Sequence, residues 1–126
     1  MRDHASNISL ASTVAPAVQS ATVKGQAVDT RDANAATVIL HTGAVAGDGD
    51  FTAKVQESDT TDDGDFVDAT NLIGAFPATL EANKTLKVGY VGYKRYVRLV
   101  LTKNGGTSIA ASAVVELSAL RERPAA

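Results

Sequence analysis

Carboxylates are the side chains of this sequence with the clearest potential for chemistry. Five aspartates stand close together, at positions 59, 62, 63, 65 and 68. Calcium favours clustered oxygen ligands of this kind, and Asp59, Asp63 and Asp65 are the candidate metal ligands. The segment departs from the EF-hand pattern, because Thr61 and Thr70 stand where an acidic ligand and the closing glutamate should be. We therefore favour a solvated loop at a strand end and predict no bound metal.

A catalytic site is the second possibility, but the sequence contains few residues and no motifs that support one. The two histidines are His4, near the first residue, and His41, at the end of an apolar stretch. A serine–histidine–aspartate triad could be assembled from the residue types present, yet the sequence has no nucleophile elbow. It has neither a phosphate-binding glycine loop that ends in Lys-Ser or Lys-Thr nor an HExxH motif. We expect a protein that is not an enzyme and that needs no cofactor.

All three tyrosines lie in one short basic segment, residues 90–98. Aromatic and basic side chains in alternation can stack on bases and contact phosphates. The net charge of -2 and the pI near 5.6 argue against a dedicated nucleic-acid binder, which carries a basic stripe. Tyrosine and arginine are also enriched at protein interfaces. We take Tyr90, Tyr93 and Arg95 as candidate protein-interface residues.

Length and composition describe one ordinary domain. The chain has 126 residues, 44% of them hydrophobic and 21% charged, which excludes wholesale disorder and leaves no room for a second domain. Without cysteine, disulfides and thiolate metal sites are excluded. No apolar run is long enough for a transmembrane helix, so we expect no membrane partner. Polar residues interrupt the N-terminal stretch, so we expect no signal peptide.

The N-terminal residues 1–18 are rich in alanine, serine, threonine and valine and show neither a helical period nor a sustained alternation. We predict an extended N-terminal arm. Its apolar side chains Ile8, Leu10 and Val14 are candidate interface residues, because such an arm can add a strand to a neighbour's sheet edge. We expect deletion of residues 1–15 to leave a folded domain.

Turn-punctuated strands make up the rest of the sequence. Alternation and β-branched runs predict strands over residues 19–29, 36–43, 51–58, 86–91, 95–102 and 107–117. Residues 68–74 could hold a single helical turn. Asn-Gly-Gly at 104–106 is a tight hairpin signal, after which the last strand could return beside the one before it.

This pattern predicts an all-β fold. We expect a single antiparallel β-sandwich or jelly-roll-like domain over residues 19–120, followed by a flexible C-terminal tail over residues 121–126. An immunoglobulin-like and a jelly-roll strand order both remain open, because short antiparallel strands suit either.

Several segments taken together resemble known proteins. They are AGDGDFTAKVQESD at 46–59, VGYVGYKRYVRLVLT at 88–102 and NGGTSIAA at 104–111, with FPATL at 76–80 between them. The set is similar to small structural proteins of tailed-bacteriophage heads, which are encoded near the major capsid protein. The resemblance spans most of residues 1–118.

The resemblance implies a decoration or cement protein that binds the outside of the phage head and bridges capsid subunits. Its location would be the capsid surface of the virion, and the host cytoplasm during assembly. The implied partners are the major capsid protein and further copies of the chain, as a homotrimer or a homodimer, with neither nucleic acid nor membrane. The alternatives are a head–tail connector or tail-side component and a carbohydrate-binding β-sandwich module, although the absence of tryptophan argues against the latter.

Overall fold

The computed structural model describes residues 2–31 and 33–120, and within them the backbone is mostly extended. The strands are β1 (Ser9–Gln19), β2 (Val23–Lys24), β3 (Val28–Asp29), β4 (Ala33–Ala46), β5 (Asp50–Ser58), β6 (Val67–Asp68), β7 (Leu72–Ile73), β8 (Thr85–Tyr90), β9 (Tyr96–Gly105) and β10 (Ser108–Leu120). Two short 3-10 helices, η1 (Ala5–Asn7) and η2 (Asp63–Asp65), complete this part of the chain. None of its helices is long and apolar enough to span a bilayer. The predicted tail over residues 121–126 lies outside the described residues.

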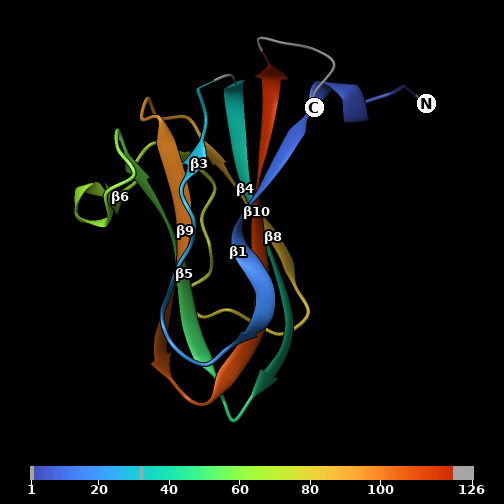
Figure 1. Cartoon of the computed structure of the whole chain (residues 1–126). Coiled ribbons are helices and arrows are strands. Elements are labelled where there is room, and N and C mark those ends of the chain that lie inside the picture. Colours follow the sequence, from blue (N-terminus) through green and yellow to red (C-terminus); the bar gives the residue numbers. More distant parts are fainter. Residues whose placement is uncertain (1, 32, 121–126) are drawn as a thin grey trace.

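Two antiparallel sheets face each other (Figure 1). Sheet A has the order β1-β10-β4-β8-β7, and sheet B has the order β2-β9-β5-β6, with β3 also paired to β9. The chain crosses between the sheets after β1, β3, β4, β6, β8 and β9, so the pairs β1·β10, β2·β9, β4·β8 and β5·β6 are wound around one another. This is the strand order of a jelly roll. The predicted all-β sandwich is confirmed, and the strand order is the jelly-roll one.

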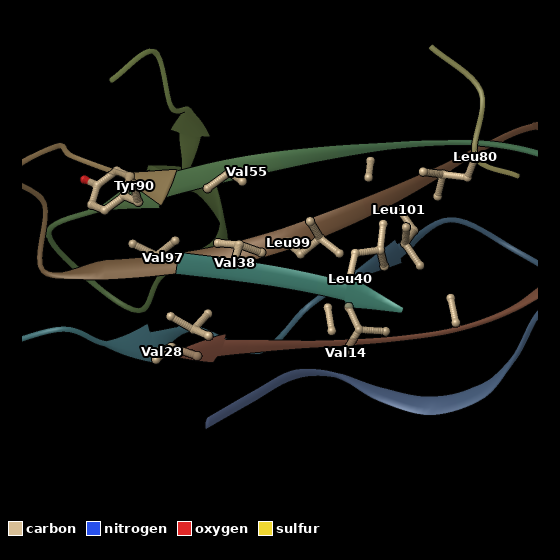
Figure 2. Packing of buried hydrophobic residues seen from close by; sticks show 14 of the residues in the cluster. Val14, Val28, Val38, Leu40, Val55, Leu80, Tyr90, Val97, Leu99 and Leu101 are labelled. Atoms are coloured by element: carbon tan, nitrogen blue, oxygen red, sulfur yellow. The ribbon is translucent and has the colours of Figure 1, made fainter. Parts of the chain in front are cut away.

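The core lies between the two sheets and is built from alternate residues of each strand (Figure 2). Phe51, Leu40, Leu99 and Ile109 are fully buried there. Burial of each large apolar side chain stabilises the fold by roughly 1.5–3 kcal/mol. The predicted strands 36–43 and 51–58 fall within β4 and β5, and β4 is an interior strand because it pairs with both β10 and β8.

The N-terminal segment belongs to sheet A, which corrects the predicted extended arm over residues 1–18. Most of that segment forms β1 beside β10, and Val14 is only 1% exposed. The register shifts between Ser12 and Val14 and again between Val14 and Ala17. These bulges break the alternation of inward and outward side chains, and for that reason the sequence shows no period of two.

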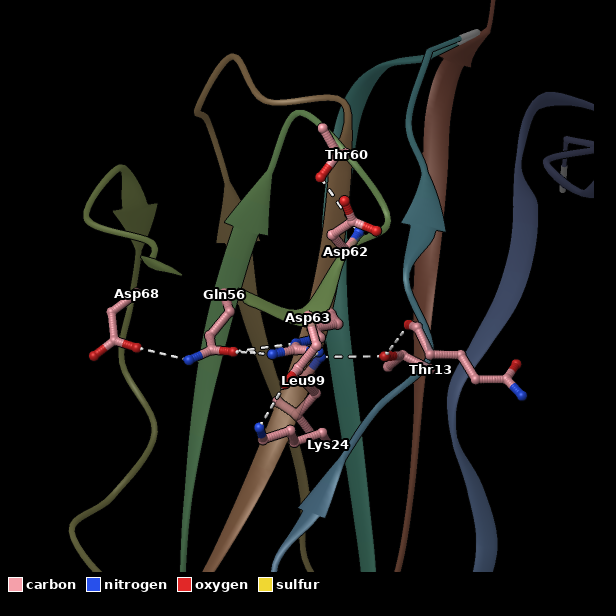
Figure 3. Close-up of polar contacts among 10 residues, drawn as sticks. Thr13, Lys24, Gln56, Thr60, Asp62, Asp63, Asp68 and Leu99 are labelled. Carbon is pink, nitrogen blue, oxygen red and sulfur yellow. Dashed lines mark hydrogen bonds and ion pairs between the residues drawn. The ribbon is translucent and has the colours of Figure 1, made fainter. Parts of the chain in front are cut away.

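One buried hydroxyl ties β1 to sheet B. The Thr13 hydroxyl donates a hydrogen bond to the Gln26 carbonyl oxygen (2.8 Å) and accepts one from the Leu99 N–H (3.1 Å) (Figure 3). The intervening Gly25 N–H donates to the Leu99 carbonyl oxygen (2.8 Å). The close approach of these backbones around Gly25 divides the predicted strand 19–29 into β2 and β3.

The hairpin predicted after Asn104 does not form, because β10 crosses to the opposite sheet instead of returning beside β9. Gly106 adopts a φ of 72°, and the Thr107 N–H donates to the Gly47 carbonyl oxygen (3.2 Å). The β9–β10 turn therefore packs on the β4–β5 turn. Both turns pass from one sheet to the other at the same end of the sandwich. The alternate apolar residues of β10 face sheet B from this position, which a hairpin beside β9 would prevent.

The helical turn predicted over residues 68–74 is also wrong. Leu72 and Ile73 form the short strand β7, where Leu72 pairs with Tyr90 of β8. Leu72 packs against the core, so pairing with β8 prevails over the weak local helical preference. The helical turn lies earlier, as η2.

Candidate protein-binding surface

One end of the sandwich gathers most of the candidate interface residues. The strand register aligns Ser9 with Leu117, Leu117 with Ala36, and Ala36 with Tyr90, so these four residues form a row across sheet A. The N-terminal half of β1 and the connection between β8 and β9 therefore lie at the same end. We call residues 91–95 of that connection the tip loop.

Tyr90 supports the tip loop from below and is not itself an interface residue. The side chain is 6% exposed, because it points from β8 into the core. Its hydroxyl donates to Glu57 Oε2 (2.5 Å) and accepts from the Lys94 N–H (3.0 Å). Burial, together with the hydrogen bond to the Glu57 carboxylate, raises the pKa of the Tyr90 phenol well above its usual range. The predicted interface role of Tyr90 is corrected accordingly.

The tip loop is held at both ends by backbone hydrogen bonds. The Val91 N–H donates to the Asn71 carbonyl oxygen (2.9 Å), and the Thr30 N–H donates to the Arg95 carbonyl oxygen (2.8 Å). Between them, Gly92 passes so close to the Tyr90 ring that a Cβ atom there would meet the phenolic oxygen at 2.5 Å. The loop thus wraps tightly over a buried ring.

Ion pairs add to this support. Lys94 Nζ lies 2.8 Å from Asp59 Oδ2, and the Asp59 partner raises the pKa of the Lys94 ammonium group. Arg95 forms two hydrogen bonds with the Asp29 carboxylate, at 3.2 Å from Nε and 2.9 Å from its terminal nitrogen. The Arg95 bond lowers the pKa of Asp29. Arg95 therefore fixes the base of the loop, while about two fifths of its side chain stays accessible.

Tyr93 lies in the middle of the tip loop, and nearly all of its side chain is exposed to solvent. It is 95% exposed, and its neighbour Val91 is 55% exposed. An aromatic ring held by an ordered backbone loses little conformational entropy when a partner covers it. Aromatic anchors of this kind contribute much of the binding energy of protein interfaces. The tip loop is suited to insertion into a pocket of another protein.

The candidate residues of β1 divide into two groups. Val14 lies in the core and is unavailable to a partner, which corrects its predicted interface role. Leu10 is 61% exposed and Ile8 is partly exposed, at the same end as the tip loop. Val18, which the sequence analysis did not select, is 68% exposed farther along the strand. Inward and outward positions could not be assigned from the sequence, because the bulges interrupt the period of β1.

The aspartates of the acidic loop, residues 59–65, are not brought together as ligands. Asp59 pairs with Lys94, as described above, and Asp65 accepts a hydrogen bond from the Thr60 hydroxyl (2.7 Å). Asp63 lies 2.9 Å from Lys24 Nζ, and a second ion pair joins it to Arg98. In the described part of the chain, no group of three acidic or histidine side chains could hold a metal ion.

Arg98 anchors the acidic loop on the outer face of sheet B. Its guanidinium lies 2.7 Å from Asp63 Oδ1, donates to Gln56 Oε1 from two nitrogens and covers the Phe66 ring at 4.0 Å. Gln56 in turn donates to Asp68 (3.1 Å) (Figure 3). Hydrogen bonds from Lys24 and Arg98 lower the pKa of Asp63. The ion pairs of Asp63 with Lys24 and Arg98 therefore hold the acidic loop against the outer face of sheet B.

The histidines show no shared arrangement. His4 precedes η1, and the His41 ring on β4 forms a hydrogen bond of 2.8 Å with the Thr85 hydroxyl. His41 is exposed on the outer side of sheet A. The sequence pattern predicts a strand-end position for His41, but the residue lies inside β4, which continues to Ala46, and its ring pairs with Thr85 on the neighbouring strand β8.

Comparisons with known proteins find a likeness to solved structures only. No protein-family model matches the sequence, and no curated protein matches it either. Among solved structures, the fold is similar to a chain in the structure of infectious bursal disease virus Gx strain, with a TM-score of 0.40 and 12% sequence identity. The match covers 93% of this chain and 34% of that chain, so this chain spans about a third of the viral chain's length.

Proposed function

We propose that this protein is a non-enzymatic structural component of a bacteriophage virion, a decoration or cement protein that binds the outside of the capsid. The observation that carries the proposal is Tyr93, a 95% exposed aromatic side chain on a loop whose backbone is held from both sides. A single-chain protein gains nothing in stability from such an arrangement, since exposed aromatic surface is unfavourable in water. Burial of the ring by a partner protein would remove this unfavourable exposed surface and so favour binding.

Two further features support a capsid partner. The sequence segments at 46–59, 88–102 and 104–111 resemble phage head proteins, and the second of them contains the tip loop. The jelly roll is an architecture of viral capsid domains, although lectins and cupins also use it, so the fold alone does not assign the role. The major capsid protein is the partner that this combination favours, and many copies on a lattice make modest contacts collectively strong.

Replacement of Tyr93 by alanine is expected to weaken capsid binding by at least about tenfold, because central aromatic anchors contribute about 2 kcal/mol or more. The melting temperature should not change, since the ring makes almost no contact within the chain. The measurement is binding of purified protein to phage particles that lack it, by co-sedimentation over a range of protein concentrations.

Val18→Ala is the matched control, because Val18 is also strongly exposed but lies toward the other end of β1. It should bind as the unmodified protein does. The tip loop would be excluded as the contact if Tyr93→Ala bound equally well. Absence of binding by the unmodified protein would contradict the capsid role itself.

A further inference from the structure

Strand β1 is a long edge strand. It has 11 residues and, in the described part of the chain, pairs with β10 alone. The other strands that end the sheets, β2, β6 and β7, have two residues each. Natural proteins protect sheet edges by making them short or by placing charges or proline on them. The edges formed by β2, β6 and β7 are short, whereas that of β1 is not.

Part of the β1 edge is closed. The Gln26 N–H donates to the Thr13 carbonyl oxygen (2.6 Å), so a partner strand cannot pair there. Beyond it, Pro16 and the register shift that ends at Ala17 interrupt the strand. The stretch before Thr13 has a regular register with β10, and Ile8 just before the strand is already extended. We call residues 8–12 the open segment.

The open segment lacks charge. Residues 5–23 contain no aspartate, glutamate, lysine or arginine, although charged residues make up 21% of the chain. The open segment consists of Ile8, Ser9, Leu10, Ala11 and Ser12. Leu10 is 61% exposed and points away from the core, since its neighbour on β10 is Glu116, between the inward-facing Val115 and Leu117. An uncharged edge with an exposed leucine fits a partner strand that is equally uncharged.

We propose that the open segment pairs antiparallel with the open segment of a second copy of this chain, around a two-fold axis at Leu10. Residues directly opposite in an antiparallel pair point to the same face, so the axis must pass through a residue rather than between two. With the axis at Leu10, the two leucines meet on the outer face of sheet A, and the small Ser9 lies opposite the partner's Ala11. An axis at Ala11 would require the Thr13 carbonyl oxygen, which is already occupied.

This pairing is isologous and closes at two copies. It joins the two A sheets into one continuous sheet across the axis. Because five residues from each chain bury little surface, the pairing is weak in dilute solution and gains strength where copies are concentrated, as on a lattice. The pairing does not depend on the proposed capsid role, and its test uses the purified protein alone.

The chain has no cysteine, so one introduced thiol reports on the pairing. Opposed residues of an antiparallel pair have Cα atoms about 4.5–5.5 Å apart, within the range that a disulfide spans. Under mild oxidation at high protein concentration, Leu10→Cys is expected to form a covalent dimer. Val18→Cys, whose side chain position is similarly exposed on the same strand, is expected to stay mostly monomeric. Equal cross-linking of both variants, or none in Leu10→Cys, would overturn the proposal.

A charge exchange tests the same register without a covalent bond. Leu10→Lys and Leu10→Glu each place like charges opposite one another and are expected to raise the dimer dissociation constant by about tenfold. An equimolar mixture of the two variants should dimerise at least as well as the unmodified chain, as measured by sedimentation equilibrium. A monomer at every concentration, a trimer, or a mixture no better than either variant alone would each contradict the pairing.

Discussion

Deletion of residues 1–15 is expected to abolish cooperative folding. The deletion removes the buried Val14 side chain and the Thr13 hydroxyl, which joins the two sheets through Gln26 and Leu99. It also leaves the Leu99 N–H without its acceptor and exposes the long edge of β10. Loss of the buried valine and the unsatisfied buried N–H together cost on the order of 5 kcal/mol, comparable with the net stability of a small domain.

Thermal unfolding followed by near-ultraviolet circular dichroism measures this effect through the tyrosines. The matched control is deletion of residues 1–7, which removes η1 but retains β1, and η1 has no buried residue. That shorter deletion should unfold cooperatively, with a melting temperature within a few degrees of the full chain. A cooperative transition in the longer deletion would show that β1 is dispensable and would restore the extended arm expected from the sequence.

Replacement of Gly25 by alanine is expected to destabilise the protein by about 3 kcal/mol. A Cβ atom at this position would lie 2.5 Å from the Leu99 carbonyl oxygen, 2.5 Å from Thr13 Oγ1 and 2.7 Å from the Thr13 carbonyl oxygen. These atoms belong to backbone or to a buried hydrogen-bonded hydroxyl, so β1 and β9 must move apart to make room. Forced overpacking in a buried site costs roughly 1–3 kcal/mol, and the loss of the hydrogen bonds that meet there adds to that cost.

Gly64→Ala is the matched control, because a Cβ atom at Gly64 meets nothing within 4 Å. Its free energy of unfolding in urea should stay within about 0.5 kcal/mol of the unmodified value, as exposed substitutions usually do. The closure of the sandwich through Gly25 would be contradicted if both alanine variants unfolded at the same urea concentration as the unmodified protein.

The interior strands could be predicted from the sequence because their side chains follow a simple physical pattern. Residues 36–43 are apolar on both faces, and β4 indeed has a neighbouring strand on each side. Residues 51–58 alternate, and β5 buries every second side chain over most of its length. The β1 strand could not be predicted in this way, since two bulges and Pro16 interrupt its period.

The tyrosines show how far the candidate site could be predicted. Tyr90 and Tyr93 occur in one segment, and the sequence analysis assigned both to the interface. The turn signal that separates them is Gly92, between the predicted strands, and it could have placed Tyr93 on a loop. The acceptor of the buried Tyr90 hydroxyl is Glu57, which is 33 residues away in the sequence and reaches the phenol only after the sheets have packed.

The environment of Arg98 beneath the acidic loop could not be predicted from the sequence either. Its alternation with Val97 and Leu99 indicates an outward-facing side chain, yet it is 6% exposed. The acidic loop covers it, and the pairing with Asp63 is a contact between distant segments that no local pattern contains. Aspartates that resemble metal ligands in the sequence thus serve as partners of Lys24, Lys94 and Arg98 in the fold.

The number of copies per particle tests the central claim most directly. Quantitative mass spectrometry of purified virions of the encoding phage, against the major capsid protein, gives this number. We predict a ratio of about one, or about one third, as expected for a protein that occupies every subunit or every local symmetry axis of the lattice. About a dozen copies per particle would contradict lattice-wide decoration and favour the connector, and absence from the virion would contradict the structural role altogether.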